Sequence, residues 1–380
     1  MFKNSMEPRQ RTLLKFLGLS ADRRLELKFS MIRGAAAILV SVGVATVLIF
    51  LISSTPLLAL RYLLLGPFST ERQIWVVFER MIPLMFTGLA VCLMFSANQF
   101  NLAADGCVLL GGFVAALCAI YIPMPPVIHV VVCLLAGAAV CALLMLIPAL
   151  LQTKLGANVM VSTLMLNYVV MYVVQYFLIN VVADKTQGTT RSLPFLKTAM
   201  IPTMAYQTSW GFVIGACFVA IVGVFMYRTR WGYSIRMVGI NQNFSGYSGI
   251  KVGGTIVLCQ VVGGALAGLG GGVEVLGYYK SFSWRDLTGY GWDGITIAIL
   301  AKNNPILVPF AAFFLAYLSR GCVLMASNTD VPAEMLDVIQ AVILLFFGAE
   351  HFLAKYRQRM VVKQAKREYS DIADPKEVRG

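Results

Sequence analysis

Residues 106–153 read GCVLLGGFVAALCAIYIPMPPVIHVVVCLLAGAAVCALLMLIPALLQT, and this stretch decides the fold class of the chain. It contains no Asp, Glu, Lys or Arg, and it is too long for a single membrane-crossing helix of about 20 residues. Pro123, Pro125 and Pro126 interrupt it, and proline ends or kinks a helix. The stretch therefore predicts two consecutive membrane-spanning helices.

The same apolar character extends from Gly34 to Gly348. Hydrophobic residues make up 58% of the chain and charged residues only 13%, too few to cover a water-exposed surface of this size. We expect an all-α integral membrane protein of about ten spans whose outer surface contacts membrane lipid. The predicted spans are Gly34–Ile52, Met81–Phe95, the two helices within 106–153, Asn158–Val181, Ser209–Tyr227, Val252–Val273, Gly294–Ala301, Pro305–Leu318 and Val331–Gly348.

Three segments interrupt the pattern of long apolar spans. The run 294–301 is so short that it predicts a broken or partly buried helix. Arg72 and Glu79 are assigned to a polar loop before the second span. The segment from Glu274 to Trp292 is assigned to a polar and aromatic loop.

The net charge of +13 fits membrane topology better than nucleic-acid binding, because the Lys and Arg residues flank apolar runs. They gather in a basic N-terminal segment, 1–33, in the middle segment 228–251 and in a charged tail, 351–380. Six predicted spans separate the first two segments and four separate the last two. Even numbers of spans place all three segments on one side of the membrane, and their positive charge makes this the cytoplasmic side, around a transmembrane domain at 34–350. We expect no nucleic-acid partner.

Enzyme motifs are missing from the sequence. It has no phosphate-binding loop and no His-Glu-x-x-His, it holds only two histidines, and its eight cysteines lie singly within apolar runs. We expect no catalytic residue, no metal site and no cofactor in this chain.

The segment RTRWGYSIRMVGINQNFSGYSGI, residues 228–250, combines positive charges, aromatic residues and glycines between two spans. These features suit a short helix that docks into a groove of a cytoplasmic partner. A solvated basic loop would have the same composition, so physical reasoning alone leaves both interpretations open.

This segment resembles the cytoplasmic coupling segment of bacterial ABC-importer permeases, in the nucleoside and simple-sugar branch of the branched-chain permease superfamily. Four further blocks resemble that branch in the same order: FNLAADGC (100–107), NVMVSTLMLNY (158–168), GALAGLGGGVEVLG (264–277) and GWDGITIAILAKNNP (291–305). The resemblance implies a type II importer-like fold in the bacterial inner membrane. The residues that it implies for coupling to the ATPase are Arg228, Arg230, Gly232, Arg236, Gly239, Asn241 and Gly249.

The resemblance also implies partners. ATP would be used by cytoplasmic ATP-binding subunits, a second and often different permease would complete the pore, and an extracytoplasmic substrate-binding lipoprotein would deliver the cargo. The chain departs from the family pattern at Asp105, Cys107, Val159 and the pair 301–302. The first three departures lie in blocks expected to line the path, so they leave the cargo open.

Polar residues at membrane depth are costly unless they pair or line a wet cavity, which makes them candidates for the substrate path. Aromatic neighbours, Tyr290 among them, could stack on a neutral ligand. Capping of a helix end beside glycine is the structural alternative for the carboxylates. The path candidates are Asn101, Asp105, Asn167, Tyr168, Glu274, Trp292 and Asp293.

The expected function is ATP-driven import of nucleosides by alternating access, with simple sugars or other small polar solutes as the second choice of cargo. A secondary transporter driven by an ion gradient is the main alternative. A membrane enzyme acting on lipid would need clustered catalytic groups, and the sequence offers none.

Overall fold

The computed structural model describes residues 43–51, 53–184, 190–206 and 208–348. Residues 49–336 form one compact unit, which carries both candidate sites; residues up to 48 and from 337 onward belong to a second unit. Most of the predicted first span, 34–52, lies outside the described residues, as do the segments 1–33 and 351–380.

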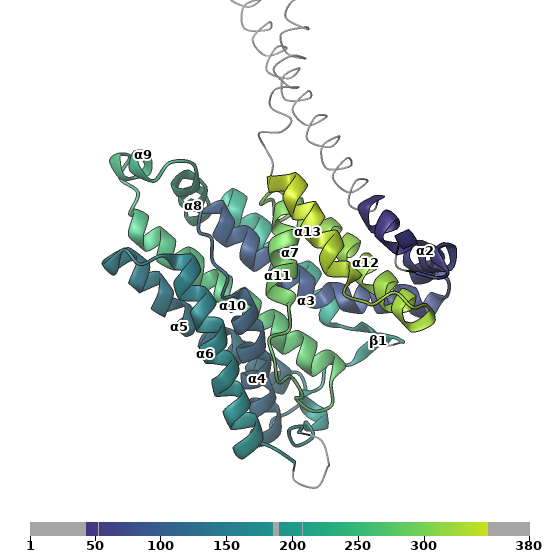
Figure 1. Cartoon of the computed structure of the whole chain (residues 1–380). Coiled ribbons are helices and arrows are strands. Elements are labelled where there is room, and N and C mark those ends of the chain that lie inside the picture. The colour runs from purple at the N-terminus through teal and green to yellow at the C-terminus, as the bar shows by residue number, and fades with distance from the viewer. Residues whose placement is uncertain (1–42, 52, 185–189, 207, 349–380) are drawn as a thin grey trace, which may run out of the picture. The chain divides into compact units, whose positions relative to one another are not determined.

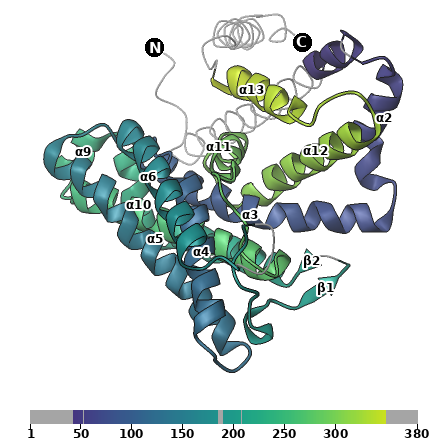
Figure 2. The same ribbon diagram turned by 60° about the horizontal axis from the view of Figure 1, so that its bottom comes forward.

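The described part of the chain is mainly helical, as predicted (Figures 1 and 2). A helix lies over each predicted span after the first, and seven helices there are long and apolar enough to cross a membrane. The helices are α2 (Pro56–Leu65), α3 (Glu71–Ser96), α4 (Ala104–Tyr121), α5 (Ile128–Leu155), α6 (Val159–Asn180), α7 (Gly211–Arg228), α8 (Arg230–Ile240), α9 (Gln242–Tyr247), α10 (Val252–Tyr278), α11 (Tyr290–Leu300), α12 (Val308–Asn328) and α13 (Met335–Gly348).

Short elements join these helices. Single 3-10 turns occupy Gly66–Phe68 and Lys197–Ala199, and an antiparallel hairpin of β1 (Thr203–Ala205) and β2 (Thr208–Ser209) precedes α7. α11 has 11 residues against the eight of the predicted run 294–301, and it is still a short helix. At about 1.5 Å per residue it rises about 16 Å, roughly half of a bilayer core.

Three helices extend into segments that the sequence assigned to loops, and one of them is α11, which begins at Tyr290. α3 begins ten residues before Met81, so Arg72 and Glu79 are helical, and α10 continues past Glu274 to Tyr278. Of these polar residues, Glu79 and Glu274 are buried against other helices, whereas Arg72 is exposed. Their charge lowered the local hydropathy without ending the helix.

α10 lies at the centre of the packing and contacts α3, α4 and α5. Its glycines allow these contacts: a side chain at Gly268 would meet Cys141 of α5, and one at Gly271 would meet the Val108 carbonyl of α4. Small residues let helices approach closely in lipid, where no hydrophobic effect drives them together.

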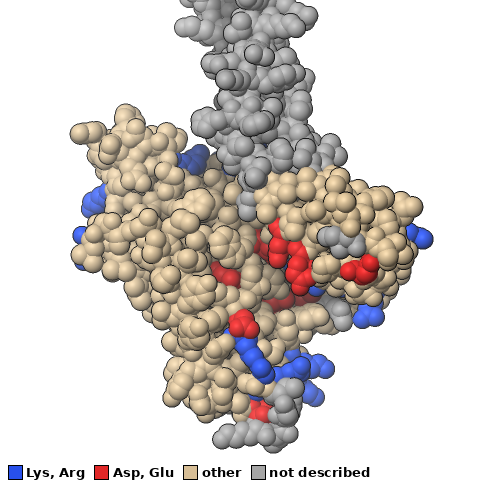
Figure 3. All heavy atoms as spheres, in the orientation of Figure 1, with Lys and Arg blue, Asp and Glu red and all other residues tan. Residues whose placement is uncertain are grey.

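The outer helices expose apolar side chains. α5 and α6 carry almost only uncharged side chains on the face drawn in Figure 3, and much of the surface of both helices is open. This distribution fits contact with lipid.

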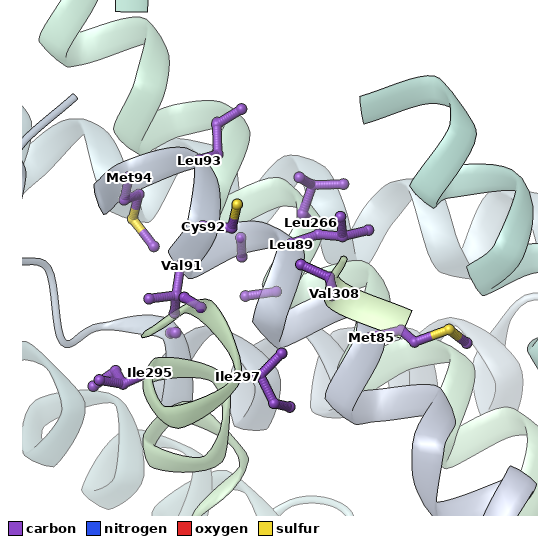
Figure 4. Close-up of a cluster of buried hydrophobic side chains, with 14 of the residues drawn as sticks. Met85, Leu89, Val91, Cys92, Leu93, Met94, Leu266, Ile295, Ile297 and Val308 are labelled. Carbon is purple, nitrogen blue, oxygen red and sulfur yellow. The ribbon is translucent and has the colours of Figure 1, made fainter. Parts of the chain in front are cut away.

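An apolar layer fills the middle of the unit. Side chains from α3, α10, α11 and α12 pack together there, among them Met85, Leu89, Leu266, Ile297 and Val308 (Figure 4). On α3 this layer separates two polar regions, one near Glu79 and one near Ser96.

Candidate functional site

A polar cavity of about 390 Å³ lies where α3, α10, α11 and α12 meet. Its volume falls within the range of roughly 300–1,000 Å³ that is usual for small-molecule sites. Charged and aromatic side chains line it: Arg72, Gln73, Val76, Glu79 and Arg80 of α3, Glu274 and Tyr278 of α10, Tyr279 just after it, Tyr290 of α11 and Arg320 of α12.

Two buried carboxylates in this cavity are only half satisfied. Glu79 is 3% exposed and accepts a 2.9 Å hydrogen bond from the Ser209 N–H through Oε2. Glu274 is 6% exposed and accepts a 3.5 Å bond from the Tyr290 hydroxyl through Oε1. Among the residues that the structure describes, Glu79 Oε1 and Glu274 Oε2 have no hydrogen-bond partner. Each carboxylate therefore keeps an acceptor for something else.

Two of the three arginines of the cavity donate to neutral partners. Arg80 Nη1 donates to the Ser319 hydroxyl and Arg320 Nε donates to Gln73 Oε1, both over 2.7 Å. A guanidinium has five N–H donors, so each of these arginines keeps donors beyond the bond described. The cavity thus combines free acceptors, donors and aromatic rings, which suits a polar organic solute.

Of the predicted path residues, the structure brings Glu274 into this cavity, together with Tyr290. Asp105 instead lies at the start of α4, where its carboxylate accepts hydrogen bonds from the Thr288 hydroxyl and from the Gly289 and Gly291 N–H groups. These donors precede or open α11. Asp105 therefore ties the first turn of α4 to the N-terminus of α11.

Asn167 and Asn101 also hold the start of α4. Asn167 accepts from the Gly106 N–H and donates to the Leu102 carbonyl. Asn101 accepts from the Ala103 N–H over 2.8 Å. Tyr168 and Trp292 are about half exposed on α6 and α11, Asp293 lies in the first turn of α11, and these three residues do not line the cavity.

Asn101 is the last member of a chain of buried side-chain amides. Gln99 donates to the Ala97 carbonyl, Gln152 donates to Gln99, Gln260 donates to Gln152, and Asn101 donates to Gln260. This chain links the loop after α3 to α5, α10 and the segment that enters α4.

Sequence reasoning missed most of the cavity. Arg72, Val76, Glu79 and Arg80 are spaced i, i+4, i+7 and i+8, which is the spacing of one helix face, and this period could have identified α3. Arg320 is a single charge within the apolar run of α12. An isolated charge in a span is a recognised functional signal.

The second candidate site is the helical pair α8 and α9, at the other end of α3. The Thr229 hydroxyl caps α8 by accepting from the Gly232 N–H, and the Asn241 side chain caps α9 by accepting from the Phe244 N–H. Gly249 then adopts a φ of +84°, which glycine tolerates best, and the chain turns into α10.

One face of α8 packs against its own chain. Gly232 lies against the backbone of Phe225 and Met226, and Gly239 lies against the Ser96 carbonyl at the end of α3. Arg236 places its guanidinium 5.2 Å from the centre of the Tyr227 ring. Three of the predicted coupling residues therefore support α8 from inside.

The other face of the pair is open, and α9 projects beyond the ends of α5 and α6 (Figure 1). The predicted coupling residues Arg228, Arg230, Asn241 and Gly249 are exposed there. Large apolar side chains accompany them, namely Trp231, Tyr233, Ile240, Phe244 and Tyr247, and Tyr247 is 94% exposed. Exposed aromatics and arginines are typical of the centre of a protein interface.

Comparison with known proteins identifies the family of the chain. Residues 75–348 match the family described as "Branched-chain amino acid transport system / permease component". The guanosine ABC transporter permease protein NupP of Bacillus subtilis is 28% identical over 292 residues, which cover 75% of this chain and 84% of that protein. The nucleoside ABC transporter permease protein NupB of Lactococcus lactis is 27% identical and the alignment covers 82% and 90% of the two chains.

A sugar permease is similar to the same degree. The glucose ABC transporter permease protein TsgB13 of Haloferax volcanii is 27% identical, with 84% of this chain and 87% of that protein covered. No solved structure matches the chain.

Proposed function

Since the chain belongs to the family of branched-chain amino acid transport system permease components, we propose that it is the membrane-spanning permease subunit of an ATP-driven ABC importer for nucleosides. The guanosine and nucleoside permeases among its relatives support this cargo, and the glucose permease keeps simple sugars as the second candidate. The chain supplies the path through the plasma membrane, and partner subunits use the ATP.

The observation that carries the proposal is the exposed face of α8 and α9. This pair is capped at both helix starts, packed against α3 and α7 on one side, and covered with aromatic and basic side chains on the other. A rigid helix with an unpartnered aromatic face is what a groove on a cytoplasmic ATP-binding subunit would bind.

The proposed topology places ten spans between two cytoplasmic ends, as in type II importers. Segments 1–33 and 351–380 are the cytoplasmic ends and 34–350 is the transmembrane domain. With α8 and α9 on the cytoplasmic side, α3 and α10 carry Glu79 and Glu274 toward the opposite side. A second permease subunit and an extracytoplasmic binding lipoprotein complete the assembly, and movement of α8 changes which side of the path is open.

The test removes the exposed aromatics of the pair. The complete transporter, with its ATP-binding subunits, is purified with Phe244→Ala and Tyr247→Ala together, and substrate-stimulated ATPase and uptake into proteoliposomes are measured. We expect at least a tenfold loss of both, because aromatic anchors at interface centres typically contribute about 2 kcal/mol or more. Tyr121→Ala, an exposed tyrosine at the far end of α4, is the control. Unchanged ATPase and uptake in the double variant would show that the pair does not couple the motor.

A further inference from the structure

The two unsatisfied carboxylate oxygens of the polar cavity need an explanation. Glu79 and Glu274 come from different helices, both are more than nine-tenths buried, and both line the same cavity. A buried acceptor without a donor is costly, by about 1–3 kcal/mol or more for a charged group. Both oxygens have almost no accessible surface, so a donor inside the cavity reaches them only when the two carboxylates turn toward it.

We propose that this cavity is a cargo-binding site in which Glu79 and Glu274 accept hydrogen bonds from adjacent O–H or N–H donors of a neutral solute. This inference rests on the proposed function, because it assumes that the chain transports a polar solute of this class. It names the residues that recognise the cargo. It also names adjacent O–H or N–H donors as the feature of the cargo that they bind.

The other lining residues fit such a solute. Tyr278, Tyr279 and Tyr290 offer aromatic rings for stacking on a planar base or a sugar face. The guanidinium groups of Arg80 and Arg320 offer donors to carbonyl or hydroxyl oxygens. With Arg72 the lining has three guanidinium groups and two carboxylates, an excess of positive charge that disfavours a cationic ligand.

A nucleoside presents adjacent donors in two places. The ribose 2′- and 3′-hydroxyls form one pair, and the amide N–H and amino group of guanine form the other. Adenine presents a lone pair at the equivalent ring nitrogen, which a carboxylate repels. The ribose hydroxyls and the guanine N–H groups are both pairs of adjacent hydrogen-bond donors. Substrates that lack one of the two pairs distinguish them.

The position of the cavity suits a first binding step. Glu79 is 17 residues before Ser96, which corresponds to about 25 Å along α3. On α3, Leu89 of the apolar layer (Figure 4) lies between Glu79 at the cavity and Ser96, which contacts Gly239 of α8. Cargo bound at Glu79 and Glu274 would therefore sit on the far side of this layer from the ATPase.

Glutamine substitutions test the proposal without removing the existing contacts. In Glu79→Gln and Glu274→Gln the amide oxygen can keep the bond from Ser209 or Tyr290, while the NH₂ group replaces the free acceptor with a donor. Glu71→Gln is the matched control, since Glu71 is an exposed residue of the same helix two turns earlier. Membrane content and co-purification of the ATP-binding subunits confirm that each variant is assembled.

Uptake of guanosine, adenosine and 2′,3′-dideoxyguanosine is measured for each complex. We expect KM for guanosine to rise at least tenfold in either variant and to stay within twofold in Glu71→Gln. If the carboxylates read guanine, the preference for guanosine over adenosine falls; if they read ribose, the preference for guanosine over the dideoxy compound falls. Assembled variants in which neither preference changes would overturn the inference.

Failure of the proposed function gives a different result. A wild-type transporter that takes up glucose and no nucleoside would refute the nucleoside cargo. The same comparison would then use glucose and its deoxy analogues, whose neighbouring hydroxyls are the donors. If the wild-type complex takes up nucleosides and the variants have unchanged KM, the nucleoside cargo stands and only the cargo-binding role of the cavity is refuted.

Discussion

The Thr288 hydroxyl donates a 2.9 Å hydrogen bond to Oδ1 of Asp105 and joins the loop before α11 to the first turn of α4. The Gly291 N–H donates to the same oxygen over 3.3 Å. A single buried carboxylate thus fixes the position at which a half-length helix starts inside the unit. This geometry is that of a helix cap supplied by another helix.

Asp105→Ala should destabilise the protein strongly, because it leaves the Thr288 hydroxyl and the Gly289 and Gly291 N–H groups without this acceptor. We expect a loss of about 2–4 kcal/mol in unfolding free energy, measured as a lower Tm of the detergent-solubilised protein. The exposed loop variant Asp286→Ala should change stability by less than about 0.5 kcal/mol. Equal Tm values for the two variants would contradict the capping role.

Gly239→Ala should disturb the joint between α8 and α3, since a methyl group there would overlap the Ser96 carbonyl. We expect substrate-stimulated ATPase to fall at least fivefold while the protein still reaches the membrane. Gly246→Ala is the control, because the nearest atom to its added methyl is 3.9 Å away. The prediction fails if both variants keep wild-type ATPase.

Gln260→Leu should break the amide chain in its middle. It leaves the side-chain carbonyl of Gln152 and the side-chain NH₂ group of Asn101 without these partners, at a cost of about 1–3 kcal/mol for each. Thermal unfolding of the purified protein measures the loss. Gln175→Leu, which removes one bond to the Arg285 carbonyl at the surface, should have a much smaller effect.

Asp330 gives a pH-dependent prediction at the protein surface. Hydrogen bonds from the Ser53 hydroxyl, and then from the Ser54 N–H and hydroxyl, lower its pKa to about 2. A lowered pKa means that the ionised form is stabilised by folding, so its contribution is present above the ordinary value of 3.8 and disappears as the pH falls toward 2.

The Tm of Asp330→Asn should accordingly lie below that of the wild type at pH 6, and the difference should shrink between pH 4 and pH 2. Asp286→Asn provides the comparison for a carboxylate elsewhere on the surface. A difference that is constant across this range would show that the charge of Asp330 does not stabilise the fold.

Hydropathy predicted the membrane class and the order of helices well, because long runs such as 106–153 have no other stable arrangement. It failed where a span buries charge. Hydropathy places the start of α3 at Met81 because Arg72, Glu79 and Arg80 precede that residue, yet all three line a cavity between helices and Glu79 is buried, unlike a residue of a water-exposed loop. Average hydropathy cannot separate these two environments, whereas helical spacing can.

The candidate sites were predictable to different degrees. The segment 228–251 was identified as a unit, but its sequence could not indicate that Gly239 meets Ser96, which is 143 positions earlier in the chain. Glu274 was proposed for the path on its polarity alone. Its neighbours in the cavity come from three other helices, and only the tertiary packing brings them together.

The contact between Gly239 and Ser96 has a mechanical consequence. Because the contact leaves no room for a methyl group, a displacement of α8 toward α3 must also move α3. A displacement of α8 away from α3 breaks the contact. α3 is a single helix from this joint to the cavity. Pro83 removes a backbone hydrogen bond from α3 between Glu79 and Ser96, so a displacement of the joint reaches the carboxylate as a change of bend at Pro83.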